Sequence, residues 1–166
     1  MHNNCYWLPP TIPQNRGELT SSYLDRLYDI FNADFNLTRP QFLGKDVIYV
    51  TNPKIGKWEQ SFYHITTFDD HNTNFQNRVI DYARAERIAW IRKVIENYQC
   101  KDGCCNGLKI YKVKNRIHIL FEKESYIVVL EQRTTNYVLV TAYKFTKPLE
   151  LEKKLKQYEY YKNIPI

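Results

Sequence analysis

The sequence contains no apolar run long enough to cross a membrane. It also lacks, after Met1, the apolar segment that marks a secretion signal. Its first ten residues, "MHNNCYWLPP", are instead polar and then proline-rich. From these two absences we expect a cytoplasmic protein that makes no contact with a membrane.

The usual ligand patterns of a metal site are also missing. The four cysteines are Cys5, Cys100, Cys104 and Cys105, and no C-x-x-C or H-x-x-x-H pair completes a set of four zinc ligands. No convincing cluster of carboxylates is present to hold a harder ion. We therefore expect neither a metal nor another cofactor. In a reducing compartment the "CKDGCC" cysteines are expected to be free thiols, with a disulfide from Cys100 to Cys104 or Cys105 left open under oxidising conditions.

The chain has no internal repeat and no low-complexity segment. Its 166 residues are 43% hydrophobic and 25% charged, which is typical of one globular domain. Lys and Arg number 24 against 18 Asp and Glu, giving a net charge of +6. This balance favours a nucleic acid or another polyanion as partner, although a basic globular protein without such a partner has the same balance. Because the basic residues form no tail, the fold must assemble any binding patch.

The pattern along the chain predicts an α+β fold, with N-terminal helices packed on a small antiparallel sheet. Residues 1–19 are expected to form an extended arm, residues 20–147 the α+β domain, and residues 148–166 a helix packed on that domain. The period of two in "EQSFYHITTF" (59–68) predicts a strand, and the period of "FQNRVIDYARAERIAWIRKVIENY" (75–98) predicts one long helix. Four strand-like runs between residues 108 and 145, joined by short turns, predict an antiparallel meander.

His64 and Thr66 share one face of the predicted strand at residues 59–68. A histidine in this setting is either a satisfied residue at the edge of the core or a general acid or base, because its side chain titrates near neutral pH.

Arg84 and Arg87 lie one turn apart on the predicted long helix, on the stripe that otherwise faces the core. They either form buried ion pairs, with Glu86 or Glu131 as partners, or clamp a phosphate with their planar guanidinium groups.

Polar residues also mark the last two strands of the predicted meander. Glu131 and Arg133 share a face at the end of one strand, and Thr141 and Tyr143 share a face of the next with Leu139 and Tyr137. Each pair alone is compatible with an ordinary solvated or half-buried strand. Together with His64 and the two arginines, they would supply a proton carrier, fixed positive charge and hydroxyl donors.

The order of "FYHITT", "ERIAWIRKVIEN", "YIVVLEQR" and "VTAYKF" resembles the phage-associated nucleases of the barnase–EndoU–colicin–RelE group. The resemblance covers roughly residues 25–146. It implies an α+β fold with a small antiparallel sheet and an often toxic, metal-independent endoribonuclease. The products would be a 2′,3′-cyclic phosphate and a 5′-hydroxyl.

Transferred to this chain, the resemblance implies that His64 is an acid or base, with Glu131 or Tyr143 as the second proton carrier. Arg84, Arg87 and Arg133 would hold the phosphate, and Thr141 would belong to the same catalytic set. Substrate-binding residues are expected at Thr66, Trp90, Arg92 and Tyr137. The expected partners are RNA, including tRNA, and an acidic inhibitor protein.

Two other functions are open. "YHITT" also resembles a stretch of ADP-ribosyltransferase toxins, for which Tyr126 and Glu131 would complete an NAD site. A non-catalytic RNA-binding module would account for the basic charge and the 14 tyrosines.

Overall fold

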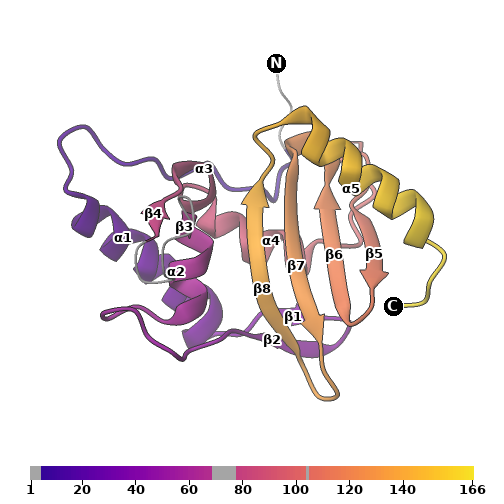
Figure 1. Ribbon diagram of the computed structural model, residues 1–166, viewed down its shortest axis with the longest axis horizontal. Helices are drawn as coiled ribbons and strands as arrows, with labels where there is room; N and C mark the ends of the chain where they lie inside the picture. The colour runs from indigo at the N-terminus through magenta and orange to yellow at the C-terminus, as the bar shows by residue number, and fades with distance from the viewer. Residues whose placement is uncertain (1–4, 69–77, 104) are drawn as a thin grey trace.

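The structure is a computed structural model, and it describes residues 5–68, 78–103 and 105–166. Its centre is a curved sheet of six strands in the order β1-β2-β8-β7-β6-β5 (Figure 1). The strands span Gln41–Phe42 (β1), Lys45–Ile48 (β2), Lys109–Val113 (β5), Arg116–Phe121 (β6), Tyr126–Gln132 (β7) and Tyr137–Lys144 (β8). All neighbours are antiparallel except β2 and β8, which run parallel. The α+β class and the meander β5–β8 predicted from the sequence are therefore confirmed.

Among the described residues that precede the meander there are four α-helices. They are α1 (Thr20–Asn32), α2 (Gln60–Thr66), α3 (Tyr82–Ala85) and α4 (Ile88–Glu96), and a π-helical turn, Ala33–Leu37, extends α1. α1 and α4 bury their apolar residues in the larger core cluster together with one face of the sheet, called here the inner face. Residues 5–19 hold no helix or strand and lie against this core, because the Trp90 indole donates to the carbonyl of Pro9 at 2.8 Å.

The opposite, outer face of the sheet carries the C-terminal helix α5 (Pro148–Tyr161), which crosses it obliquely (Figure 1). Pro148 stands in the first turn of α5, where a missing N–H leaves no helical hydrogen bond unmade. Leu151, Leu155 and Tyr158 pack on a second cluster that contains Tyr111 and Phe145. α5 crosses the outer face at the end where β8 finishes and leaves the end at the β7–β8 hairpin uncovered (Figure 1).

The predicted strand at residues 59–68 is wrong. Residues Gln60–Thr66 form α2, and only Thr67–Phe68 form a strand, β3, which pairs with β4 (Val79–Ile80). Phe62 packs edge-on against Tyr28 of α1, with ring centroids 5.1 Å apart. This contact with a helix, rather than pairing in the main sheet, decides the local structure, so tertiary packing overrides the β-branched and aromatic pattern.

The predicted long helix at residues 75–98 is also wrong. Its first residues, 75–77, lie outside the described residues, and the rest divides into β4, α3 and α4. Asp81 caps α3 by accepting from the backbone N–H of Arg84 at 3.1 Å. The chain breaks again at Glu86, because its carbonyl accepts the N–H of Ile12 from the N-terminal segment at 2.7 Å. The break separates Arg84 from Arg87, so their side chains do not share one continuous helical stripe.

A register shift in β8 corrects a further prediction. Thr141 pairs with Val129 and Leu139 with Leu130, so Val140 is one extra residue in the strand. Tyr137 and Leu139 therefore point to the inner face, whereas Thr141 and Tyr143 point to the outer face. The predicted common face of these four residues is wrong because of this bulge.

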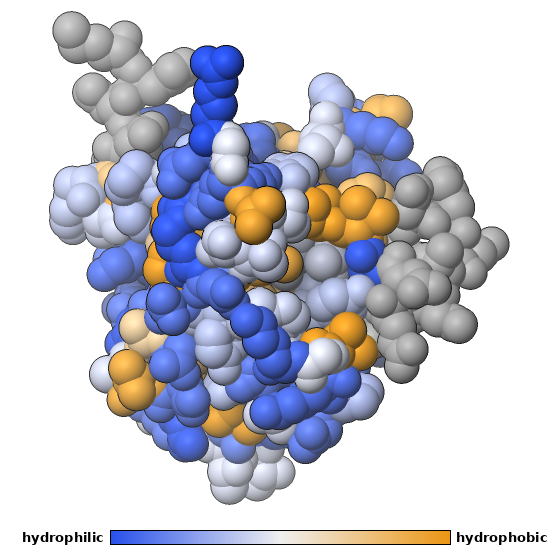
Figure 2. Space-filling model, turned by 90° about the vertical axis from the view of Figure 1, so that its left-hand side faces the viewer, coloured by the Kyte–Doolittle hydropathy of each residue, from blue (hydrophilic) through white to orange (hydrophobic). Residues whose placement is uncertain are grey.

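In the described ranges, no helix is long and apolar enough to pass through a membrane. At the end of the molecule formed by α1 and α2, the surface is mostly hydrophilic with small, separate apolar patches (Figure 2). Exposed apolar side chains such as Leu19 and Leu37 are of the scattered kind found on most proteins.

Candidate functional site

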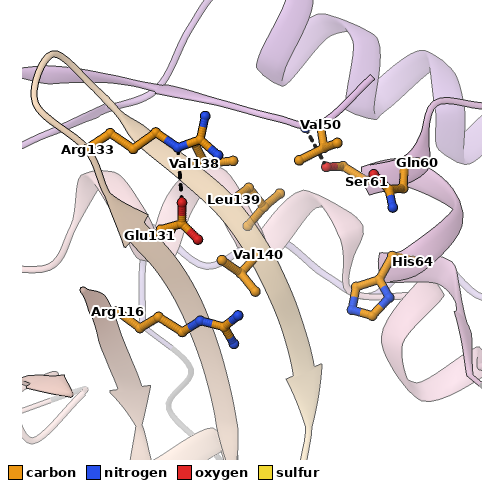
Figure 3. Close-up of a pocket in the computed structure, with 10 residues that line it drawn as sticks. All are labelled: Val50, Gln60, Ser61, His64, Arg116, Glu131, Arg133, Val138, Leu139 and Val140. Atoms are coloured by element: carbon orange, nitrogen blue, oxygen red, sulfur yellow. Dashed lines mark hydrogen bonds and ion pairs between the residues drawn. The ribbon is translucent and has the colours of Figure 1, made fainter. Parts of the chain in front are cut away.

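A pocket of about 230 Å³ lies between α2 and the open end of the outer sheet face (Figure 3). Beyond Ile48 and Val138 no strand of the described residues pairs with this edge of β8, and α2 packs there instead. The pocket thus combines side chains of one helix with side chains of three strands. Its lining residues are Val50, Gln60, Ser61, His64, Arg116, Glu131, Arg133, Val138, Leu139 and Val140.

α2 contributes Gln60, Ser61 and His64, and His64 lies on the same side of the helix as the other two because it follows them by four and three residues. The Ser61 side chain has a structural role, since its hydroxyl oxygen accepts a hydrogen bond from the backbone N–H of Val50 at 2.8 Å. His64 points from the helix toward the strands (Figure 3). Burial, followed by the charges of Arg78 and Arg84, lowers the pKa of His64 to about 4. At neutral pH His64 is therefore uncharged, and this form accepts a proton.

Glu131 and Arg133 form an ion pair on the strand side of the pocket, with Arg133 Nε 3.0 Å from Glu131 Oε1 (Figure 3). Arg133 is exposed, and its two terminal nitrogens take no partner among the described residues. The carboxylate thus fixes the guanidinium at one edge and leaves its other edge available.

Arg116 is a further cation of the pocket, and the sequence interpretation missed it. It stands directly opposite Glu131 in the β6–β7 ladder and is exposed. Within the described residues it forms no ion pair. The hairpin register contained the signal, because residues that face each other across antiparallel strands lie on the same side of the sheet.

Apolar residues form the floor of the pocket at the point where β8 is irregular. Val138, Leu139 and Val140 lie between the charged strand residues and His64 (Figure 3). The bulge at Val140 turns this residue toward the outer face, beside the pocket. An apolar floor with charged groups at its margin suits a ligand that has both a ring and an anionic group.

Arg84 and Tyr143 do not line this pocket but a neighbouring one of about 490 Å³. The Arg84 guanidinium lies over the Tyr143 ring at 5.1 Å from its centroid, and Nε pairs with Asp81 Oδ2 at 3.0 Å. Arg84 Nη1 also reaches the carbonyl oxygen of His64 at 3.5 Å. Arg84 therefore influences His64 from the neighbouring pocket, through its contact with the His64 carbonyl and through its positive charge.

Arg87, Trp90 and Arg92 have structural contacts away from the pocket. Arg87 pairs with Glu86 and lies over the Trp90 ring at 5.0 Å from its centroid. Arg92 pairs with Glu96 at 2.8 Å and donates to the carbonyl of Asp34 at 2.9 Å. Arg87 thus forms the ion pair with Glu86 that was one of its two interpretations. Neither Arg87 nor Arg92 faces His64.

The remaining predicted site residues also lie apart from the pocket. Thr66 is buried and donates to the carbonyl of Phe62 at 2.9 Å. Tyr137 is buried against Phe42, with ring centroids 5.0 Å apart. Thr141 is half-buried on the outer face and lines neither pocket.

The residues named for an NAD site are separated by the sheet. Tyr126 is buried on the inner face against Trp90, at a centroid distance of 5.4 Å. Glu131, an odd number of residues further along β7, faces outward into the pocket. These two side chains therefore do not form one site.

Among the residues that the structure describes, no group of three or more His, Cys, Asp or Glu side chains lies close enough to hold a metal ion. Comparisons with protein-family models, with curated proteins and with solved structures found no match to this chain.

Proposed function

We propose that the pocket of His64, Arg116, Glu131 and Arg133 cleaves RNA without a metal ion, by attack of the 2′-hydroxyl on the adjacent phosphate. One observation carries this proposal: an uncharged histidine faces two exposed arginines and a carboxylate across one pocket. Transfer within RNA needs a proton acceptor and fixed positive charge around the phosphorus, and the pocket supplies both.

In the first step, neutral His64 accepts the proton of the 2′-hydroxyl. The 2′ oxygen forms a bond to phosphorus, and the bond from phosphorus to the 5′ oxygen breaks. The 5′ oxygen takes a proton from water, to which the exposed side of the pocket is open, and the other product is a 2′,3′-cyclic phosphate. DNA is not a substrate, because it lacks the attacking hydroxyl.

Arg116 and Arg133 stabilise the negative charge that increases on the phosphate during this attack. A guanidinium keeps its charge at any physiological pH and presents a planar pair of donors to phosphate oxygens. Glu131 orients Arg133 through the Nε–Oε1 contact of 3.0 Å. Its Oε2 accepts no hydrogen bond among the described residues and is free to accept one from a bound substrate.

The specific relationship to the barnase–EndoU–colicin–RelE nucleases remains part of this proposal. It is supported by the succession of N-terminal helices and an antiparallel meander whose outer face carries the charged residues. A toxin-like role with an acidic inhibitor follows from the same resemblance and from the net charge of +6.

The decisive experiment is incubation of the purified protein with total RNA and tRNA in EDTA. We expect discrete fragments that end in a cyclic phosphate, formed by wild-type protein and not by His64→Ala. Intact RNA, together with NAD hydrolysis in a parallel assay, would replace the proposal with NAD-dependent transfer. RNA binding without cleavage would replace it with a binding module.

A further inference from the structure

The second pocket adjoins the first and shares a strand with it. It is lined by residues of α3, of β8 and of the first turn of α5, together with Phe68 of β3. Arg84 links the two pockets, since it lines the second and contacts the backbone of His64 in the first. Val140 in the first pocket and Tyr143 in the second are three residues apart on β8, which is roughly 10 Å at the usual strand rise.

An aromatic surface and a fixed cation meet in this second pocket. Phe68 is 38% exposed and lines it, although large apolar side chains are usually buried. Arg84 is held in place by Asp81 and by the Tyr143 ring, and its Nη2 takes no partner among the described residues. An exposed ring suits base stacking, and a positioned guanidinium suits a phosphate.

Lys147 supplies a second cation to this pocket. It is exposed at the start of α5, and among the described residues it forms no ion pair and no side-chain hydrogen bond. Lys144 differs, because its Nζ donates to the carbonyl of Glu124 at 3.0 Å. The basic lining residues are Arg84, Lys144 and Lys147 and the acidic ones are Asp81 and Glu150, so one positive charge is in excess. A single phosphodiester carries the matching charge.

We propose that the second pocket binds the nucleotide next to the cleaved linkage, with its base on Phe68 and its phosphate at Arg84 and Lys147. This inference rests on the proposed ribonuclease function and makes the substrate a single strand that runs along β8. It also gives Arg84 and Tyr143, expected in the catalytic set, a role in substrate binding beside that set.

The test compares two RNA substrates of different length. A dinucleoside monophosphate contains only the scissile phosphate, whereas a hexanucleotide also reaches the second pocket. We expect Phe68→Ala to raise KM for the hexanucleotide about ten-fold, the effect of one lost stacking contact, and to leave kcat unchanged. The kinetics on the dinucleoside monophosphate should not change.

Salt dependence provides an independent readout for Lys147. One lost phosphate contact on a single strand lowers the slope of log K against log salt concentration by about 0.7. We expect this change for Lys147→Ala and not for Lys156→Ala, an exposed lysine on the same helix that lines neither pocket. Equal KM values and equal slopes for wild type and both pocket variants would overturn the proposal that the second pocket binds a nucleotide.

If the wild-type protein cleaves no RNA, the proposed function fails. A binding experiment then tests separately whether the second pocket is a nucleotide site. A fluorescent hexanucleotide with 2′-deoxyribose cannot be cleaved by this chemistry and still carries bases and phosphates. Weaker binding to Phe68→Ala and Lys147→Ala than to wild type would support the pocket as a nucleotide site. Unchanged binding would overturn it.

Discussion

The outer face of the sheet has two ends with opposite character. Under α5 lie aromatic and aliphatic side chains, among them Tyr111 and Phe145, which pack on Leu151 and Leu155. At the open end the same strands carry Arg116, Glu131 and Arg133. Along β6 and β7 the side chains point alternately to the two faces without interruption, so both ends belong to one surface. Only the residue types differ: apolar side chains bury a helix at one end, and charged side chains are free to bind a ligand at the other.

Each end also has one histidine. His118 is buried on β6, stacked on Tyr111 with centroids 4.7 Å apart, and burial lowers its pKa to about 4, with smaller contributions from Lys154 and Arg116. Burial likewise lowers the pKa of His64 to about 4, but His64 lines an open pocket. The two histidines thus share a direction of pKa shift and differ in access to a ligand, which makes them a matched pair.

The largest effect on the rate of RNA cleavage is expected when each of the two histidines is replaced in turn. His64→Gln should lower the rate of RNA cleavage by about 10²–10⁴, the usual contribution of one proton-transfer group. His118→Gln should retain wild-type cleavage, because α5 covers that position. Cleavage rates and circular dichroism of both variants measure this difference. Equal losses in two well-folded variants would contradict a catalytic role specific to His64.

Loss of the cations at the open end should have the next largest effect. Arg116→Ala and Arg133→Ala should each lower kcat by about 10²–10³, because each removes a donor to the charge formed during attack. Lys112→Ala, a change on β5 outside the pocket, serves as the control. Steady-state kinetics would show the result, and a change confined to KM would mean that the arginines only bind the substrate.

The pH dependence of cleavage should show whether the proton acceptor is His64 with its lowered pKa or a histidine with an ordinary pKa. His64 must be unprotonated to accept a proton, so kcat should fall as pH decreases through about 4 rather than through 6.5. Arg84→Gln removes one positive charge that opposes protonation, so this acidic limb should move to higher pH. A limb that stays near 6.5 in wild type would exclude His64, in this environment, as the proton acceptor.

The contrast between the two ends also shows how far the sequence could predict this molecule. The four strands of the meander are short runs rich in Ile, Val and Tyr that are separated by short turns, and these local signals suffice for β5 to β8. Glu131 and Arg133 were correctly expected to lie together, since neighbouring positions on one strand face share a side of the sheet. His64 was selected for its chemistry, and it lines the pocket although its predicted strand is a helix.

Long-range contacts account for what the sequence could not predict. The N–H of Ile12 binds the carbonyl of Glu86, and this contact between distant segments interrupts the predicted helix. Packing of Phe62 on α1 makes residues 60–66 helical. The bulge at Val140 reverses the facing of Thr141 and Tyr143. None of these three features has a local sequence pattern. Arg84 and Arg87 were therefore wrongly expected on one helix. Thr141 and Tyr143 do share a face, but not the face of Tyr137 and Leu139.

The smallest effect on cleavage is expected from oxidation of a cysteine pair that lines neither end of the outer face. Cys100 Sγ lies 3.0 Å from Cys105 Sγ and accepts from the Trp7 indole at 3.4 Å. Burial raises the pKa of Cys100, but these hydrogen bonds outweigh it and lower the pKa below its ordinary value. A thiol with a lowered pKa reacts more readily than an ordinary one, and the second thiol lies close enough to form a disulfide with it.

Treatment of Cys104→Ser protein with oxidised glutathione should therefore join Cys100 to Cys105, with two hydrogens lost from the protein and one glutathione disulfide reduced to two thiols. The serine removes the third thiol of "CKDGCC", which could otherwise pair with Cys100 or Cys105; Cys104 itself lies outside the described residues. Mass spectrometry of tryptic peptides would identify the bond. Because neither pocket includes these cysteines, the oxidised protein should cleave RNA at the wild-type rate. A large loss of activity on oxidation would show that the cysteine loop and the open end of the sheet are coupled.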